Sequence, residues 1–190
     1  MKYLLKRFAI LSSLVFLAAC GSDDSTSTEL TEEDLASFAG LQLKPYEIPA
    51  IIMLPDETAN IGASTKPEVI HTETDFRWKI IVGPNFEMDI TDWGSEKDLV
   101  KQKKKELANT DFLSIKYLVD EPNFILYEQQ LKVKGSKKAS STVGVEHKTY
   151  HVYAEKEINK INYVFSSREE GYEKMIIELM AKSIRSVKEN

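Results

Sequence analysis

Residues 167–187 read SREEGYEKMIIELMAKSIRSV, and this stretch decides the fold. It opens with Ser167-Arg168-Glu169-Glu170, the pattern of a capping box, in which a serine and a glutamate three residues later satisfy free N–H groups at a helix start. An apolar stripe at helical spacing follows, made of Tyr172, Met175, Ile176, Leu179, Met180, Ile184 and Val187. A helix with one apolar face is predicted here, and we expect it to cover a β-sheet.

The sequence before this helix alternates between apolar and polar residues, which is typical of strands with one buried face. The clearest alternation gives two apolar series around a turn at 83–85: Phe76, Trp78, Ile80 and Val82, then Phe86, Met88 and Ile90. The pattern predicts three hairpins, with strands at residues 76–82, 86–90, 112–121, 124–133, 147–156 and 158–166. A loop at 134–145 links the last two hairpins, and a short buried strand is predicted at 50–54.

Two more helices are predicted outside the strands. Ser95 is placed to cap one of them, and its apolar residues fall near one face: Leu99, Val100 and Leu107. The other is a short helix from Leu35, which ends near Gly40. Together these elements predict an α+β protein with a single, largely antiparallel sheet of six to seven strands covered by helices.

The order of these elements resembles the PsbP-like family, which includes bacterial DcrB-like lipoproteins. The resemblance is carried by Phe86 to Ile90, the helix at Ser95, the strand Tyr163-Val164-Phe165-Ser166-Ser167 and the stripe from Ile176 to Ile184. It is a similarity of layout over most of the domain, with no diagnostic motif. It implies an accessory or binding module and carries over no catalytic residue.

The first nineteen residues have the pattern of an export signal. A basic start with Lys2, Lys6 and Arg7 precedes an apolar run from Phe8 to Ala19, which is too short to span a bilayer as a helix. The run ends in Leu17-Ala18-Ala19-Cys20, which resembles the bacterial lipobox. The sequence therefore predicts a signal peptide at 1–19 and a lipid on Cys20, the only cysteine of the chain. A disulfide, a cysteine-ligated metal site and a catalytic thiol are thereby excluded from the domain.

An acidic, serine- and threonine-rich stretch follows Cys20, and we expect it to be flexible. Its Asp23-Asp24 pair is similar to the export signal of surface lipoproteins in the Bacteroidota, and Gly21 at the second position favours the outer membrane. The predicted location is an outer-membrane anchor, on the cell surface or the periplasmic face. The predicted domains are the signal at 1–19, a spacer with a possible short helix at 20–45, and one α+β domain at 46–190.

The charge of the chain restricts its partners. The formal charge of the whole chain is −5, and removal of Lys2, Lys6 and Arg7 with the signal makes it −8. An acidic protein competes poorly for nucleic-acid phosphates, so we expect no nucleic-acid partner. The predicted contact with the membrane is the lipid itself.

Histidines are the first candidates for a metal site. His147 and His151 lie four residues apart, which would suit zinc on a helix, but the surrounding alternation predicts a strand. Four residues of a strand span about 13 Å, too far for one ion. His71 is interpreted as a surface histidine. No metal ligand and no cofactor site are therefore predicted.

Carboxylates, serines, lysines and tryptophans give weaker signals. No serine lies in a Gly-x-Ser-x-Gly turn, and the acidic pairs Glu87 with Asp89 and Asp120 with Glu121 are interpreted as solvated charge. Lysines 101 and 103–105, and lysines 132, 134, 137 and 138, are interpreted as solvated faces, with a docking patch for an acidic partner as the alternative. Trp78 is expected in the core, and Trp93 is the aromatic residue with the best chance of exposure.

We therefore expect a lipid-anchored accessory or binding module of the cell envelope, not an enzyme, with a protein or small ligand as partner. The alternative is a cell-envelope hydrolase whose site is assembled only in three dimensions. A deep pocket that holds His71, His147 or several carboxylates of shifted pKa would favour the hydrolase. A structural envelope protein would instead show a contiguous apolar patch.

Overall fold

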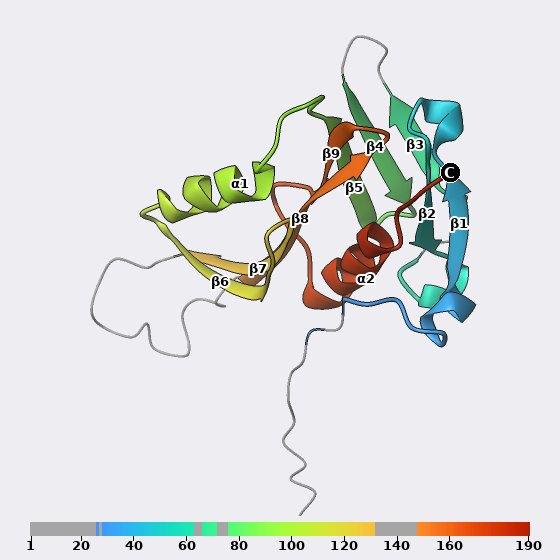
Figure 1. Cartoon of the computed structure of the whole chain (residues 1–190). Coiled ribbons are helices and arrows are strands. Elements are labelled where there is room, and N and C mark those ends of the chain that lie inside the picture. The colour runs from blue at the N-terminus through green and yellow to red at the C-terminus, as the bar shows by residue number, and fades with distance from the viewer. Residues whose placement is uncertain (1–25, 27, 63–65, 72–75, 132–147) are drawn as a thin grey trace, which may run out of the picture.

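The computed structural model describes residues 26, 28–62, 66–71, 76–131 and 148–190 (Figure 1). Within these residues the chain has the predicted α+β fold, with two α-helices and two antiparallel sheets. The larger sheet has seven strands in the order β3-β4-β5-β9-β8-β7-β6. Their bounds are β3 Glu68–His71, β4 Arg77–Val82, β5 Phe86–Asp92, β6 Leu113–Asp120, β7 Phe124–Leu131, β8 Lys148–Ile158 and β9 Ile161–Ser167.

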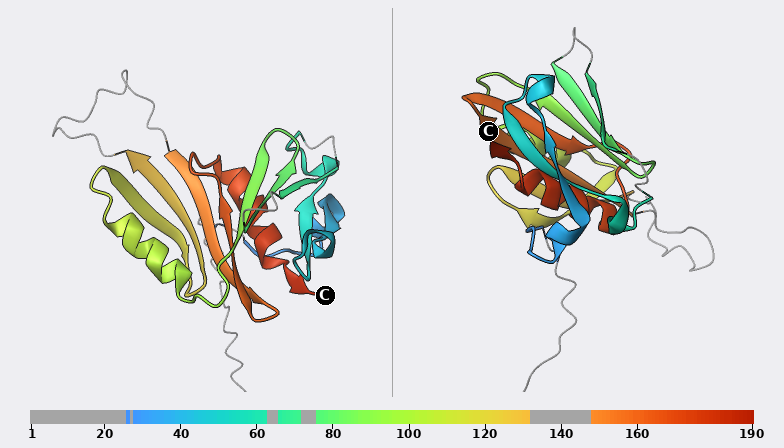
Figure 2. Two further views of the ribbon diagram at one scale, coloured as in Figure 1. Left: turned by 90° about the horizontal axis from the view of Figure 1, so that it is seen from above. Right: turned by 90° about the vertical axis from the view of Figure 1, so that its right-hand side faces the viewer.

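The smaller sheet was not predicted as a separate layer. Its strands are β1 Phe38–Gln42, β2 Ala50–Pro55 and β10 Lys188–Glu189, with β2 in the centre. Helix α2, Lys174–Arg185, lies between the two sheets and contacts both β2 and β8 (Figure 2). We call the surface of the large sheet that faces α2 the inner face.

The inner face holds the main hydrophobic core. Along β5, β8 and β9 the register places Ile90 opposite Phe165 and Phe165 opposite Ala154, so that alternate residues of three strands point the same way. All three are buried, as are Ile177, Met180 and Ile184 of α2. Both sheets bury apolar residues against α2, so this helix is covered on two sides. Its apolar stripe is accordingly stronger than that of α1.

The opposite surface of the large sheet is called the outer face, and the described residues cover it at one end only. Helix α1, Leu99–Ala108, lies over β6, β7 and β8, where Val100 and Leu107 pack against Ile125 and Tyr127. Within the described ranges, no helix lies above the outer face at β4, β5 and β9 (Figures 1 and 2). This uncovered part carries polar residues.

The predicted start of the C-terminal helix at Ser167 was wrong. Ser167 ends β9, and its hydroxyl accepts the N–H of Val152 at 3.3 Å. The chain then turns at Gly171, whose φ of 72° is incompatible with an α-helix, and Tyr172 pairs its backbone with Tyr150. Helix α2 begins only at Lys174.

The other helix starts were also misplaced. Helix α1 begins at Leu99, and Ser95 does not cap it, because the carboxylate of Glu155 accepts the Leu99 N–H at 2.8 Å. The short helix predicted from Leu35 is a single 3-10 turn, Asp34–Ser37. The residues after it extend into β1, so part of the predicted spacer belongs to the fold.

The predicted strands agree better with the structure. The hairpins β4–β5 and β6–β7 and the strand β2 are confirmed. In the last hairpin β8 runs on to Ile158, and the turn is Asn159-Lys160, both with positive φ. Phe76, expected in the core, precedes β4 and is 72% exposed. Strand β3 was not predicted, and the predicted loop at 134–145 lies outside the described residues.

Candidate functional site

A polar groove lies on the outer face beside α1. Its cavity has a volume of about 490 Å³, within the usual range of small-molecule sites, although such sites are more often apolar. Its floor comes from five adjacent strands, β4, β5, β9, β8 and β7, and α1 forms one wall. The floor residues are Arg77, Asp89, Thr91, Ser166, His151, Tyr153, Tyr127 and Gln129. Lys103 and Glu106 of α1 stand in the wall.

Strand register brings these residues together. Asp89 lies directly opposite Ser166 across β5 and β9, and Ser166 lies opposite Tyr153 across β9 and β8. His151 is two residues from Tyr153, on the same face of β8, and lies opposite Tyr127. Neighbouring strands are about 4.8 Å apart, so the groove crosses about 19 Å of sheet from β4 to β7. It is long enough for an extended small molecule.

Asp89 is the unusual residue of the groove. Its side chain is half-buried, and among the described residues it makes no hydrogen bond and no ion pair. Burial raises its pKa above 3.8, and Glu87 and Glu169 add to this, while Lys79 and Arg77 act against it. Lys79, which lies opposite Asp89, forms its ion pair with Glu87 at 2.6 Å instead. The Asp89 carboxylate therefore faces the groove without a hydrogen-bond or ion-pair partner among the described residues.

His151 closes the floor on the other side. It is 4% exposed, and its ring stacks on Tyr127 with centroids 5.1 Å apart. The Thr149 hydroxyl lies 2.9 Å from Nε2, within hydrogen-bonding distance. Burial lowers the pKa of His151 to about 4, helped by the charge of Lys103. The ring is consequently neutral at pH 7 and acts as part of the packed floor.

The cations around the groove already have partners. Lys103 forms an ion pair with Glu106 at 2.8 Å, and its ammonium lies 5.8 Å from the ring centre of Tyr153. The Arg168 guanidinium lies 4.2 Å from the ring centre of Tyr172. Arg77 also has an interaction of its own. None of them is available as an isolated positive charge for an anion.

Several neutral groups, by contrast, make no hydrogen bond to another described residue. These are the half-buried side chains of Thr91, Gln129 and Ser166, together with the phenol groups of Tyr127 and Tyr153. Burial raises the pKa of both tyrosines, that of Tyr153 to about 12, so both stay protonated near neutral pH. The groove therefore offers hydroxyl and amide groups together with the Asp89 carboxylate, a set that suits hydrogen bonding to a polar ligand.

The predicted acidic pairs behave differently from one another. Glu87 is paired with Lys79, Asp120 with Lys104, and Glu121 with Arg185 at 2.6 Å. Asp89 differs from these three because, among the described residues, it forms no ion pair. The signal that could have revealed it is the pairing of two outward polar positions, Asp89 and Ser166, but that pairing requires the order of β5 and β9 in the sheet.

The remaining candidate residues lie away from the groove or outside the described residues. His71 stacks on the buried Trp78 at 4.6 Å, beside a separate hollow lined by Tyr46 and Glu47. Trp93 is 41% exposed, as expected, but does not line the groove. His147 and Cys20 fall on residues that the structure does not describe, as do lysines 132, 134, 137 and 138.

The lysine run on α1 is partly engaged in the fold. Lys103 and Lys104 bind Glu106 and Asp120, and the Lys104 ammonium lies 5.5 Å from the ring centre of Tyr117. Lys101 and Lys105 are exposed. Two of the four lysines thus stabilise the packing of α1 on the outer face.

The described residues contain no group of three or more histidine, cysteine, aspartate or glutamate side chains arranged to hold a metal ion. No helix in the described ranges is both long and apolar enough to cross a membrane. No protein-family model, no curated protein and no solved structure matches this chain. The groove therefore has to be interpreted from its own chemistry.

Proposed function

We propose that this protein is a lipid-anchored binding module of the bacterial cell envelope, held at the outer membrane through a lipid on Cys20. Its groove beside α1 binds a small, uncharged, hydroxyl-rich ligand such as an oligosaccharide. The anchor is supported by the lipobox-like sequence Leu17-Ala18-Ala19-Cys20. The binding role is supported by the groove and by the layout that resembles PsbP-like lipoproteins.

The observation that carries the binding role is the carboxylate of Asp89, which has no hydrogen-bond or ion-pair partner in the described part of the chain. A half-buried carboxylate without hydrogen bonds costs stability, and proteins keep such groups mainly where function uses them. Asp89 lies in the groove, next to Ser166 and Thr91. We conclude that its missing partners are supplied by the ligand.

The ligand class follows from the groups that remain unpaired. The charged side chains in the lining are balanced, with Arg77, Lys103 and Arg168 against Asp89, Glu106 and Glu169. A ligand with a net charge would gain little from such a surface. Hydroxyl groups can donate to the Asp89 carboxylate and accept from Ser166 and the tyrosines, so a polyhydroxylated ligand uses the whole set.

Hydrolysis is the rival function, and the groove favours it less. Ser166, His151 and Asp89 all line the cavity, but among the described residues no hydrogen bond joins any two of them. A catalytic serine needs a base within reach and a third group that orients the base. His151 Nε2 is already next to the Thr149 hydroxyl, and the groove holds one carboxylate of raised pKa, not several.

The ligand class is tested by titrating the mature protein with maltose, lactose and N,N′-diacetylchitobiose and following backbone amides by NMR. We expect shifts at Asp89, Thr91 and Ser166, and an affinity at least about tenfold weaker in Asp89→Asn, because charge-assisted hydrogen bonds are lost. Glu68→Gln, an exposed carboxylate on β3, is the matched control and should bind normally.

Two further probes decide between ligand chemistries. Choline tests a cation and succinate tests an anion at the same groove. Shifts with either probe but with none of the three sugars would overturn the proposed ligand class. Binding that survives Asp89→Asn would overturn the role of this carboxylate.

The anchor has a separate test. Cells that express the full chain are fed an alkyne-tagged palmitate, and we expect the label on the wild type and its loss in Cys20→Ser, which should accumulate as unprocessed precursor. Equal labelling of the variant would contradict the anchor.

A further inference from the structure

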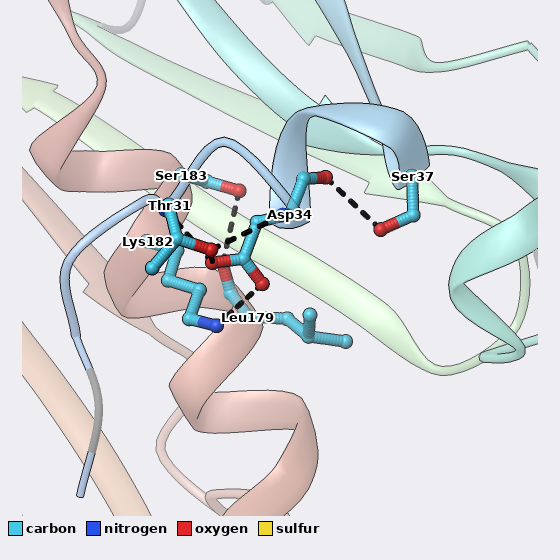
Figure 3. Close-up of polar contacts among 6 residues, drawn as sticks. All are labelled: Thr31, Asp34, Ser37, Leu179, Lys182 and Ser183. Carbon is cyan, nitrogen blue, oxygen red and sulfur yellow. Dashed lines mark hydrogen bonds and ion pairs between the residues drawn. The ribbon is translucent and has the colours of Figure 1, made fainter.

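The first described residues of the chain are fastened to the C-terminal half of α2 (Figure 3). Lys182 donates to Asp34 Oδ1 at 2.6 Å, and both side chains are largely buried. The other oxygen of Asp34 accepts the Thr31 N–H at 2.8 Å and the Thr31 hydroxyl at 2.7 Å. Burial would raise the pKa of Asp34, but the bonds from Lys182 and Thr31 outweigh it and lower the pKa below 3.8.

Arg185, one turn further along α2, holds the segment at a second point. Its Nε lies 3.0 Å from the Thr28 hydroxyl and 3.2 Å from a Glu29 oxygen, and a terminal nitrogen donates to Glu121 at 2.6 Å. The guanidinium also lies 4.2 Å from the ring centre of Phe124. Thr28 is only 7% exposed. Both cations occupy the last turns of α2, where the helix dipole favours positive charge.

We call residues 28–37 the clasp. It ends where β1 begins, and the Ser37 carbonyl accepts the N–H of Asp56 at 3.0 Å. Between Glu29 and Ser37 no residue is fully buried, and Leu35 is exposed. The clasp is therefore held by hydrogen bonds and ion pairs and has little hydrophobic contact. Attachments of this kind open locally at a much lower free energy than a core and weaken with salt.

The clasp determines how far the domain can move from Cys20. A chain spans at most about 3.5 Å per residue, so the eight residue steps from Cys20 to Thr28 reach at most about 28 Å. With the clasp released, the domain is first held at Phe38, eighteen steps from Cys20, and the reach becomes about 63 Å. One set of polar contacts thus changes the reach roughly twofold.

We propose that the clasp is a releasable leash that sets the working distance between the membrane and the ligand groove. This inference rests on the proposed lipid at Cys20. With the clasp closed, the domain stays within a short distance of the lipid headgroups. With the clasp open, the longer tether lets the groove reach targets up to about 35 Å farther away, without any change in the fold of the domain.

The clasp itself is tested by hydrogen exchange on the full lipidated chain in liposomes. The amides of Thr31, Asp34, Leu35 and Ala36 are hydrogen-bonded within the clasp. We expect the double variant Lys182→Ala/Arg185→Ala to exchange these amides at least about tenfold faster, while amides of β5 and β9 keep their protection. Lys174→Ala, at the other end of α2, is the matched control and should leave the clasp unchanged.

The distance is measured in the same liposomes by energy transfer. Because Cys20 carries the lipid, Lys105→Cys on the exposed side of α1 supplies the single thiol for a donor dye, with an acceptor on the lipid headgroups. We expect weaker transfer when Lys182→Ala/Arg185→Ala is added.

Three results would overturn the leash. Equal exchange of the clasp amides in the wild type and the double variant would show that the clasp does not hold. Faster exchange with unchanged energy transfer would show that the clasp does not set the distance. Failure of the wild type to take up lipid would remove the anchor, and the exchange data would then show whether the clasp exists independently of it.

Discussion

The two faces of the large sheet differ in how their groups are satisfied. The inner face is covered by α2 and the small sheet, and Phe165, Met88 and Ile90 are completely buried there. The outer face has residues of the same strands, one position along, that are polar and in part unpaired, Asp89 and Ser166 among them. The difference indicates that the inner face supplies stability, while the open part of the outer face is where we propose that the ligand binds.

The largest effect that separates the faces is expected from neighbouring residues of β9. Phe165→Ala should cost about 3–5 kcal/mol, since it removes a fully buried aromatic ring. Ser166→Ala, which points to the groove, should change the free energy of unfolding by less than about 0.5 kcal/mol. Urea denaturation measures both, and comparable losses in the two variants would contradict the division of the sheet.

A second comparison uses pH and concerns the buried part of the outer face. The folded pKa of His151 is about 4, below the usual 6.5, so folding favours the neutral ring. Above pH 6.5 the ring is neutral in both the folded and the unfolded chain, so the lowered pKa does not change the free energy of unfolding. As pH falls from 6.5 to 4 the unfolded chain takes up the proton first, and the wild type should lose about 3 kcal/mol relative to His151→Gln. A pH-independent difference between the two proteins would show that His151 is not enclosed.

A substitution at Gly171 tests whether His151 is enclosed by the turn, and its expected effect on stability is smaller. An added Cβ would lie 2.6 Å from Cε1 and Nε2 of His151, and the φ of 72° disfavours any side chain. Gly171→Ala should therefore cost about 1–3 kcal/mol and displace the ring. Gly94→Ala, where φ is also positive but a Cβ meets nothing within 4 Å, is the matched control for backbone strain alone. Equal losses in the two variants would mean that His151 does not pack against the turn.

Much of the inner face could be predicted from the sequence, because its residues are periodic. The alternation at 76–90 located β4 and β5, and the stripe from Ile176 to Ile184 located α2. The predicted helix starts were wrong because contacts and turns outside the local pattern determine where the helices begin. Glu155, far from Leu99 in sequence, caps α1, and the turn at Gly171 replaces the predicted capping box.

The groove could not be predicted either, because its residues are far apart in the sequence. Asp89, Ser166, His151 and Gln129 come from four strands, and only the strand order places them on one floor. Alternation did assign Asp89 to the outer side of its strand. The alternation carried no information on whether a helix, water or a cavity lies above that side. In the structure, α1 does not extend over Asp89. The clasp was missed because its partners on α2 are almost 150 residues away in the chain.

The central claim, that the outer face keeps an unpaired carboxylate for a ligand, is tested most directly by the stability of Asp89→Asn without ligand. Since burial raises the folded pKa of Asp89, its ionised form costs stability, and the cost grows as pH rises from 3.8 through the folded pKa. The account predicts that Asp89→Asn is as stable as the wild type at pH 3 and more stable at pH 7, by urea denaturation. A variant less stable than the wild type at pH 7 would contradict it, because Asp89 would then have a stabilising partner within the protein.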